Sequence, residues 1–171
     1  MSARELQQFL NTWDHEAGQT ARLLRALPAD RYDFRPDATG RTLGQLAWHL
    51  AEIEAYVTNG IVAGRLDTGE RPPGIERPKT VAELAPGYER IHADARKRVA
   101  SLTPEDLERQ VPFFDGRPTP IRDLLWSGVL YHLVHHRGQL TLMCRLAGGV
   151  TPGLYGPNRE ETAAIRGQTN R

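Results

Sequence analysis

Two histidines of this sequence, His132 and His136, are four residues apart in an apolar stretch that predicts a helix. At this spacing both side chains lie on one helix face, about one turn apart. Taking about 100° per residue, the same face carries Val129 and Met143, so both imidazoles should project into the apolar centre of a bundle. Burying two unpartnered neutral histidines costs free energy, which a shared divalent metal ion would offset.

A metal site of this kind needs a further ligand from another helix, and His49 is the residue that we expect to supply it. His49 lies at the edge of the apolar stripe of a predicted helix, next to Leu46 and Ile53. Three histidines would leave at least one coordination position open, as in catalytic sites. His135 could compete for the third position, although a supporting or surface role is the simpler interpretation.

Three further residues are predicted to bind substrate. Gly128, one turn before His132, would leave free space beside the metal, and Gln139 could form a hydrogen bond near the site. Tyr155 either folds over the mouth of the site or anchors the end of the chain. Arg137 points further round the helix, where a salt bridge or a dimer contact is the simplest interpretation.

The other histidines and the single cysteine give weaker signals. His15 should face solvent. His92 follows Glu89 in an E-x-x-H pattern, but di-iron bundles need two such motifs and further carboxylates, so we reject that interpretation. Cys144 is best explained as a small buried hydrophobic residue.

Four amphipathic segments are expected to position these residues: about 3–26, 42–62, 80–102 and 120–146. Ser2 and Glu5 form a predicted capping box, and Gly64 stands where a helix would end. The third regular helix should begin only after Pro86 and Gly87. Little strand signal is present, so the sequence predicts an all-α four-helix bundle over residues 1–157 and a polar, frayed tail over 158–171.

Other segments leave alternatives open. Residues 111–120 could form a small hairpin or an irregular loop around Asp115 and Gly116. Residues 65–79, rich in proline and glycine, should form a long loop that either borders the site or only connects helices. Trp48 points away from the apolar stripe of its helix, which predicts a packed neighbouring helix or a dimer surface.

Composition excludes several classes of protein. The 171 residues carry 22 Lys and Arg against 21 Asp and Glu, a net charge of +1, which argues against a nucleic-acid partner. One cysteine allows no disulfide within the chain and favours a reducing compartment. No run of 18 apolar residues and no signal peptide are present, so we expect a cytoplasmic protein without a membrane partner.

Three separated segments resemble the DinB family. YHLVHHRGQL (131–140) looks like the family's H-x-x-x-H-R-G-Q signature, TLGQLAWHLAEIE (42–54) is similar to its first metal-ligand helix, and GLYGP (153–157) matches a feature after its last helix. The resemblance implies up-down-down-up topology, a homodimer, and zinc or nickel held by three histidines. Those ligands correspond to His49, His132 and His136.

The resemblance also implies a function. The wider superfamily includes thiol S-transferases that use bacillithiol or mycothiol, some glutathione-dependent enzymes, and members without known activity. Three neutral imidazoles leave the metal charge uncompensated, so a coordinating thiol would lose its proton. We therefore expect a transferase that joins a low-molecular-weight thiol to a small electrophile.

Two alternatives to the transferase stay open at this point. The first is a metal-dependent hydrolase that activates water, with a general base drawn from Glu52, Glu54 or Asp123. The second is a non-catalytic metal-binding dimer with a role in the stress response.

Overall fold

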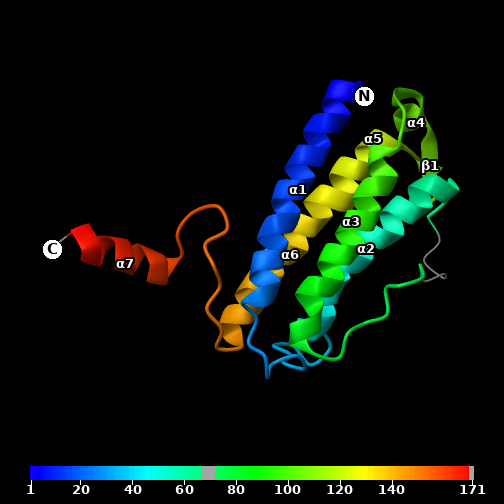
Figure 1. Cartoon of the computed structure of the whole chain (residues 1–171). Helices are drawn as coiled ribbons and strands as arrows, with labels where there is room; N and C mark the ends of the chain where they lie inside the picture. Colours follow the sequence, from blue (N-terminus) through cyan, green and yellow to red (C-terminus); the bar gives the residue numbers. More distant parts are fainter. Residues whose placement is uncertain (67–71, 170–171) are drawn as a thin grey trace.

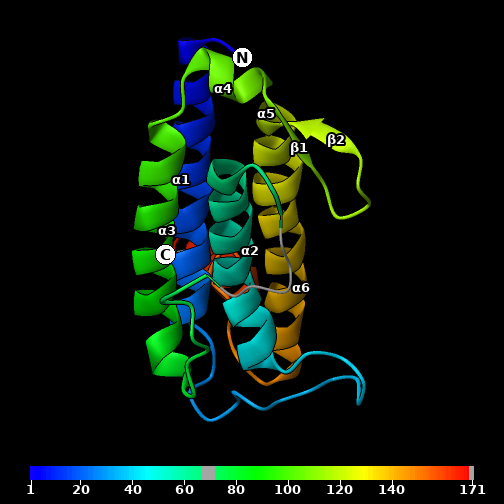
Figure 2. The same ribbon diagram turned by 90° about the vertical axis from the view of Figure 1, so that its right-hand side faces the viewer.

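The computed structural model describes residues 1–66 and 72–169 and consists mainly of helices. The four long ones are α1 (Ala3–Arg25), α2 (Leu43–Ala63), α3 (Leu84–Ala100) and α6 (His132–Leu146). They pack as a four-helix bundle in which α1 and α6 run in one direction and α2 and α3 in the other, the up-down-down-up order expected from the resemblance (Figures 1 and 2). None of the described helices is both long and apolar enough to span a membrane.

Capping residues fix where the first two helices begin and end. The Ser2 hydroxyl accepts the Glu5 backbone N–H at 3.3 Å, and the Glu5 carboxylate accepts the Ser2 N–H at 2.6 Å, so the predicted capping box is confirmed. Thr42 and Gln45 form a second capping box before α2. Gly64 ends α2 with φ of 73°, a conformation that glycine adopts without steric cost.

The third helical segment begins near residue 80, as expected, but the expectation that its regular helix begins only after Pro86 and Gly87 was wrong. A single 3₁₀ turn, η1 (Val81–Glu83), leads directly into α3 at Leu84, so Pro86 lies within the first turn of the helix. Proline is tolerated there because the first backbone N–H groups of a helix have no partner within the helix.

A small hairpin joins α3 to the last long helix. After the short helix α4 (Pro104–Glu108), β1 (Gln110–Pro112) pairs antiparallel with β2 (Pro118–Pro120). Gly116, with φ of 78°, lies in the connecting turn. The hairpin alternative for this segment is therefore confirmed.

The fourth predicted helix is not regular along its length. It consists of one α-helical turn, α5 (Ile121–Asp123), a π-helical segment, η2 (Leu124–Tyr131), and α6. A π-helix has i→i+5 hydrogen bonds and a wider turn, so the 100° spacing assumed before His132 does not hold. Such segments are frequent at functional sites, and this one directly precedes the first histidine of the pair.

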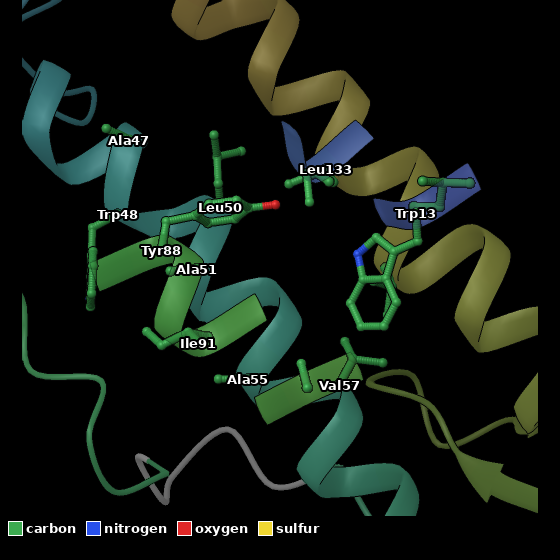
Figure 3. Packing of buried hydrophobic residues seen from close by; sticks show 14 of the residues in the cluster. Trp13, Ala47, Trp48, Leu50, Ala51, Ala55, Val57, Tyr88, Ile91 and Leu133 are labelled. Carbon is green, nitrogen blue, oxygen red and sulfur yellow. The ribbon is translucent and has the colours of Figure 1, made fainter. Parts of the chain in front are cut away.

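The core lies between all four helices, and Figure 3 shows part of it, with Trp13, Trp48, Tyr88 and Leu133 among the buried side chains. Trp48 is buried against α3, where Gly87 makes room for its ring. Its indole N–H donates to the carbonyl of Ile75 at 3.1 Å. Of the two explanations for this tryptophan, the neighbouring helix is the correct one.

We expect Gly87→Ala to destabilise the protein by about 1–3 kcal/mol, because a methyl group there overpacks the core. An added Cβ would lie 2.7 Å from Trp48 Cζ3, and the indole hydrogen bond prevents the ring from moving aside. Urea unfolding measures the effect. Gly18→Ala in α1 is the control, because nothing lies within 4 Å of its added Cβ. Equal unfolding midpoints for the two variants would contradict the close-packing argument.

The chain end also differs from the expectation of a frayed tail. Residues Arg159–Thr169 form a helix, α7, that stands beside the bundle (Figure 1). Asn158 and Glu161 cap it reciprocally, with the Asn158 side chain accepting the Glu161 N–H at 2.6 Å. The Arg145 guanidinium binds both carboxylate oxygens of Glu160 and lowers the pKa of that carboxyl to about 2. Residues 170–171 of the predicted tail and 67–71 of the predicted long loop lie outside the described residues.

Candidate metal centre

The three histidines singled out in the sequence meet between α2 and α6. One potential ligand atom of each of His49, His132 and His136 lies within 4.8 Å of the others. The ring centroids are 4.7 Å apart between His49 and His136 and between His132 and His136, and 5.7 Å apart between His49 and His132. All three residues are half-buried, so the pair on α6 borders the core rather than projecting into the centre of the bundle.

The buried residues of α6 are instead Leu133, Arg137, Leu140, Met143 and Cys144. Because they include an arginine, counting apolar residues alone misplaced the buried face of the helix. The burial expected for Cys144 is confirmed.

Each of the three rings is also held by a second group. His136 Nδ1 lies 2.7 Å from Gln139 Oε1, and His49 Nδ1 lies 3.4 Å from Glu52 Oε2. The His132 ring forms a hydrogen bond with the backbone of Gly128, inside the π-helical segment. Metal-binding histidines usually donate their second ring N–H to a carboxylate or carbonyl, which fixes the tautomer and the ring orientation.

The two histidines of α6 are arranged so that a divalent metal ion could bind between their rings. Their Nε2 atoms lie 2.9 Å apart. The amide nitrogen of Gln139 donates a hydrogen bond to His135 at 3.1 Å, so the amide oxygen faces His136. This oxygen accepts a hydrogen bond from His136 Nδ1. A neutral ring that donates through Nδ1 presents a lone pair at Nε2. A divalent metal ion between Nε2 lone pairs would remove their repulsion, so the donor set fits this group.

The protonation of these rings also suits metal binding. Desolvation lowers the pKa of His136 to about 4, opposed by the hydrogen bond that the ring donates to the Gln139 amide oxygen and helped by the neighbouring His49 and His132. Desolvation and His49 also lower the pKa of His132. Both rings are therefore neutral at neutral pH, which is the form that coordinates a metal ion.

A pocket of about 300 Å³ opens beside the cluster and includes His49 and His132 in its wall. Glu52 lines it too. Its Oε1 accepts from Arg77 Nη2 at 2.9 Å, and its Oε2 faces His49. Desolvation would raise the pKa of Glu52, but the hydrogen bonds from His49 and Arg77 outweigh it and lower the pKa. The carboxylate is therefore charged and engaged on both oxygens.

The remaining wall of this pocket comes from residues that the sequence analysis did not propose as site residues: Arg41, Ile53, Tyr56, Val57 and Phe114. Arg41 precedes α2 in a loop, and Phe114 is in the turn between β1 and β2. No motif or spacing in the sequence brings these loop residues to the histidines.

The structure separates the three predicted substrate-binding residues. Gln139 holds both His136 and His135. An added Cβ at Gly128 would make ordinary contacts with Val57 and Phe113 at 3.8 and 3.9 Å, and Gly128 is not part of the pocket wall. The Tyr155 hydroxyl donates to Glu16 Oε2 at 2.5 Å and lies within hydrogen-bond distance of Arg137, contacts that agree with the tail-anchoring alternative.

Arg137, whose role the sequence left open between a salt bridge and a dimer contact, forms a buried salt bridge. Only 1 % of the residue is exposed. Its guanidinium pairs with the Glu16 carboxylate and donates to the Glu16 carbonyl at 2.7 Å and to the Thr20 hydroxyl at 3.3 Å. Burial and the hydrogen bond to Glu16 raise the pKa of Tyr155 above its usual value.

Of the three carboxylates considered as a general base, only Glu52 lies at the histidines. Asp123 is exposed and lies beside Arg122. Glu54 is completely buried on the other side of α2, where it accepts from the Trp13 indole at 3.0 Å and the Tyr88 hydroxyl at 2.7 Å. His92 Nδ1 lies 2.9 Å from its second oxygen.

His92 therefore belongs to a polar network that the sequence analysis missed. Its Nε2 lies 3.2 Å from Asp14 Oδ1, and Arg96 donates to the same carboxylate at 2.9 Å. Glu89, the partner in the E-x-x-H pattern, instead forms an exposed ion pair with Arg25. The two residues of the pattern therefore do not converge on one site. Among the described residues, the three histidines are the group whose ligand atoms lie close enough to share a metal ion.

Comparisons with known proteins agree with the fold. The family model described as "DinB family" matches residues 1–170. The Bacillus subtilis (strain 168) protein called "Uncharacterized protein YrdA" is 33% identical over 162 residues, covering 92% of each chain. A crystal structure of a DinB-like protein from Bacillus cereus ATCC 10987 superposes with a TM-score of 0.73 at 28% identity, covering 87% of this chain and 97% of the other.

A second DinB-like structure, YjoA from Bacillus subtilis, supports the fold alone, with a TM-score of 0.71 at 21% identity over 88% of this chain and 99% of the other. The family match extends over nearly the whole chain and includes the three histidines. The chain therefore belongs to the DinB family.

Proposed function

We propose that this DinB-family protein binds a divalent metal ion, zinc or nickel, and transfers a low-molecular-weight thiol to an electrophilic carbon. The observation that carries the proposal is the convergence of His49, His132 and His136, each held by a second group. Two of them, His49 and His132, line an open pocket. When bound by three neutral imidazoles, a divalent cation favours an anionic ligand and lowers the pKa of a thiol.

The residues around the site favour a thiol over water as the nucleophile. A hydrolase of this type commonly uses a carboxylate with a free oxygen to take a proton from water. Glu52 is the only one of the three carboxylates considered that lines the pocket, and Arg77 and His49 engage both of its oxygens. A thiol with a lowered pKa releases its proton to solvent and needs no such base. Glu52 thus acts as a positioning residue for His49.

The proposed reaction balances without a redox partner. The thiol loses its proton to solvent, the sulfur forms a bond to the electrophilic carbon, and the leaving group departs with the electron pair of the broken bond. The pocket wall of Ile53, Tyr56 and Val57 offers an apolar surface to the electrophile. Half-burial of the histidines leaves the site open for both reactants to enter.

Metal content tests the ligand assignment first. We expect the wild-type chain, loaded with zinc or nickel and desalted, to retain about one metal ion per chain by elemental analysis. His49→Ala, His132→Ala and His136→Ala should each lose most of it, because two ligands do not replace three. His15→Ala is the matched control and should retain the ion, since His15 is exposed and outside the cluster. No retained metal in the wild type would refute the site.

Thiol dependence then tests the reaction. Metal-loaded protein is mixed with a thiol and a chloroalkyl electrophile, and formation of the thioether is followed by chromatography. Consumption of the electrophile that is unchanged when every thiol is omitted would instead support the hydrolase. The homodimer and the cytoplasmic location expected from the sequence stay predictions.

A further inference from the structure

Arg41 lines the pocket at the candidate metal centre, beside His49 and His132. Within residues 1–66 and 72–169, the structure gives its guanidinium no hydrogen bond and no ion pair. Asp37, which lines a neighbouring pocket together with Arg41, accepts from the Thr39 hydroxyl at 3.1 Å with both carboxylate oxygens. Other arginines near the site are engaged, as Arg77 is with Glu52. An arginine left free beside a binding site is suited to an anionic ligand.

Arg41 also stands between two pockets. It lines the pocket of about 300 Å³ that contains His49 and His132, and it lines a second pocket of about 280 Å³ that contains Gln139, the partner of His136. The rest of the second pocket is mainly apolar and includes Leu46, Leu142, Met143 and Leu146. A ligand bound in either pocket therefore lies beside Arg41.

The charge balance favours a carboxylate over a phosphate. Glu52 in the first pocket pairs with Arg77, and Asp37 in the second accepts from the Thr39 hydroxyl. Among the described residues that line the two pockets, Arg41 is the only lysine or arginine. One guanidinium matches the geometry and the single charge of one carboxylate. A phosphate carries more charge and usually also needs backbone N–H groups or further cations.

We infer that Arg41 is the specificity-determining residue of the site and selects a thiol that carries a carboxylate group. This inference rests on the proposed function, because the histidine cluster would receive the sulfur while Arg41 binds the carboxylate of the same molecule. It assigns to a loop residue the discrimination between charged and neutral thiols.

Isothermal titration calorimetry on zinc-loaded protein tests the inference with two matched probes, N-acetylcysteine and N-acetylcysteine amide. We expect the wild type to bind the carboxylate probe about 10-fold more tightly, the value of one charge-assisted contact. Arg41→Gln should bring the two affinities together by weakening only the carboxylate probe. Arg41→Lys should restore part of the preference. Arg4→Gln, an exposed arginine outside the pockets described, should leave it unchanged.

The outcomes separate this inference from the proposed function. Equal binding of both probes to the wild type, or a preference that survives in Arg41→Gln, overturns the role of Arg41 and leaves the transferase standing. No binding of either thiol to zinc-loaded wild type refutes the proposed function and this inference with it. Zinc content, measured on every variant, confirms that Arg41→Gln keeps the metal site intact.

Discussion

Arg137→Met is expected to destabilise the protein by about 3–5 kcal/mol, because it leaves a buried carboxylate without its partner. The Glu16 carboxylate lies against the core with Arg137 as its cation, and the Thr20 hydroxyl and the Glu16 carbonyl receive the other guanidinium hydrogens. Methionine fills much of the same volume, so the loss reports the charge and its hydrogen bonds rather than a cavity. Urea unfolding measures it.

Arg25→Met is the matched control for this variant. Arg25 pairs with Glu89 at 2.6 Å, but both side chains are about half exposed. An exposed ion pair contributes about 0–1 kcal/mol. A loss for Arg137→Met no larger than that of Arg25→Met would show that water reaches the pair between α1 and α6. Tyr155→Phe, which removes only the hydroxyl at Glu16, should cost about 1 kcal/mol.

The second large effect is expected from Glu54→Leu, at about 3 kcal/mol or more. The substitution leaves the Trp13 indole, the Tyr88 hydroxyl and the His92 ring without their shared acceptor in a buried site. Each buried donor without a partner costs about 1–3 kcal/mol, partly offset by the apolar side chain. Glu54→Gln is the conservative control, because its amide oxygen still accepts from Trp13 and Tyr88.

The pH dependence of stability shows how much of the effect of Glu54 comes from its interaction with a charged His92 ring. Desolvation would lower the pKa of His92, but hydrogen bonds with Glu54 and Asp14 outweigh it and raise the pKa above 6.5. A raised pKa in the folded state stabilises the protein below the unfolded value, and this contribution is lost as the pH rises through the folded pKa. The wild type should therefore lose stability above about pH 6.5.

In Glu54→Gln the loss of stability between about pH 6.5 and the pKa of folded His92 should be smaller. Only Asp14 then remains to stabilise the charged His92 ring, and Asp14 also pairs with Arg96. The measurement is the urea midpoint of both proteins from about pH 5 to about pH 9, compared as a difference so that other titrating groups cancel. Parallel curves for the two proteins would show that His92 is not charged next to Glu54.

Much of the fold follows from local signals in the sequence. Ser2 with Glu5 and Gly64 mark helix ends through hydrogen bonds with residues three or four positions away, so their neighbours in sequence suffice. The three histidines could be chosen because the pair on α6 has helical spacing and His49 borders an apolar stripe. The α7 helix has a comparable local signal, the N-x-x-E capping box formed by Asn158 and Glu161, which was not used to predict a helix.

What the sequence did not predict depends on contacts distant along the chain. Arg137 pairs with Glu16 across 121 residues, and His92 with Asp14 across 78, so a periodicity count that accepts only apolar residues cannot find them. The π-helical segment before His132 leaves no composition signal. Arg41 and Phe114 reach the pocket from loops, whose paths are set by tertiary packing.

The two faces of α6 bear on how a ligand enters. Arg137, adjacent to His136, anchors one face to α1 through the buried pair with Glu16, while the histidines occupy the face toward α2. A helix held in this way resists rotation about its own axis, because rotation would break a pair with little access to water. Motions that admit a ligand should therefore come from the hairpin turn carrying the exposed Phe114 and from the loop carrying Arg41. Relaxation dispersion should find millisecond exchange in these two loops and a quiet α6.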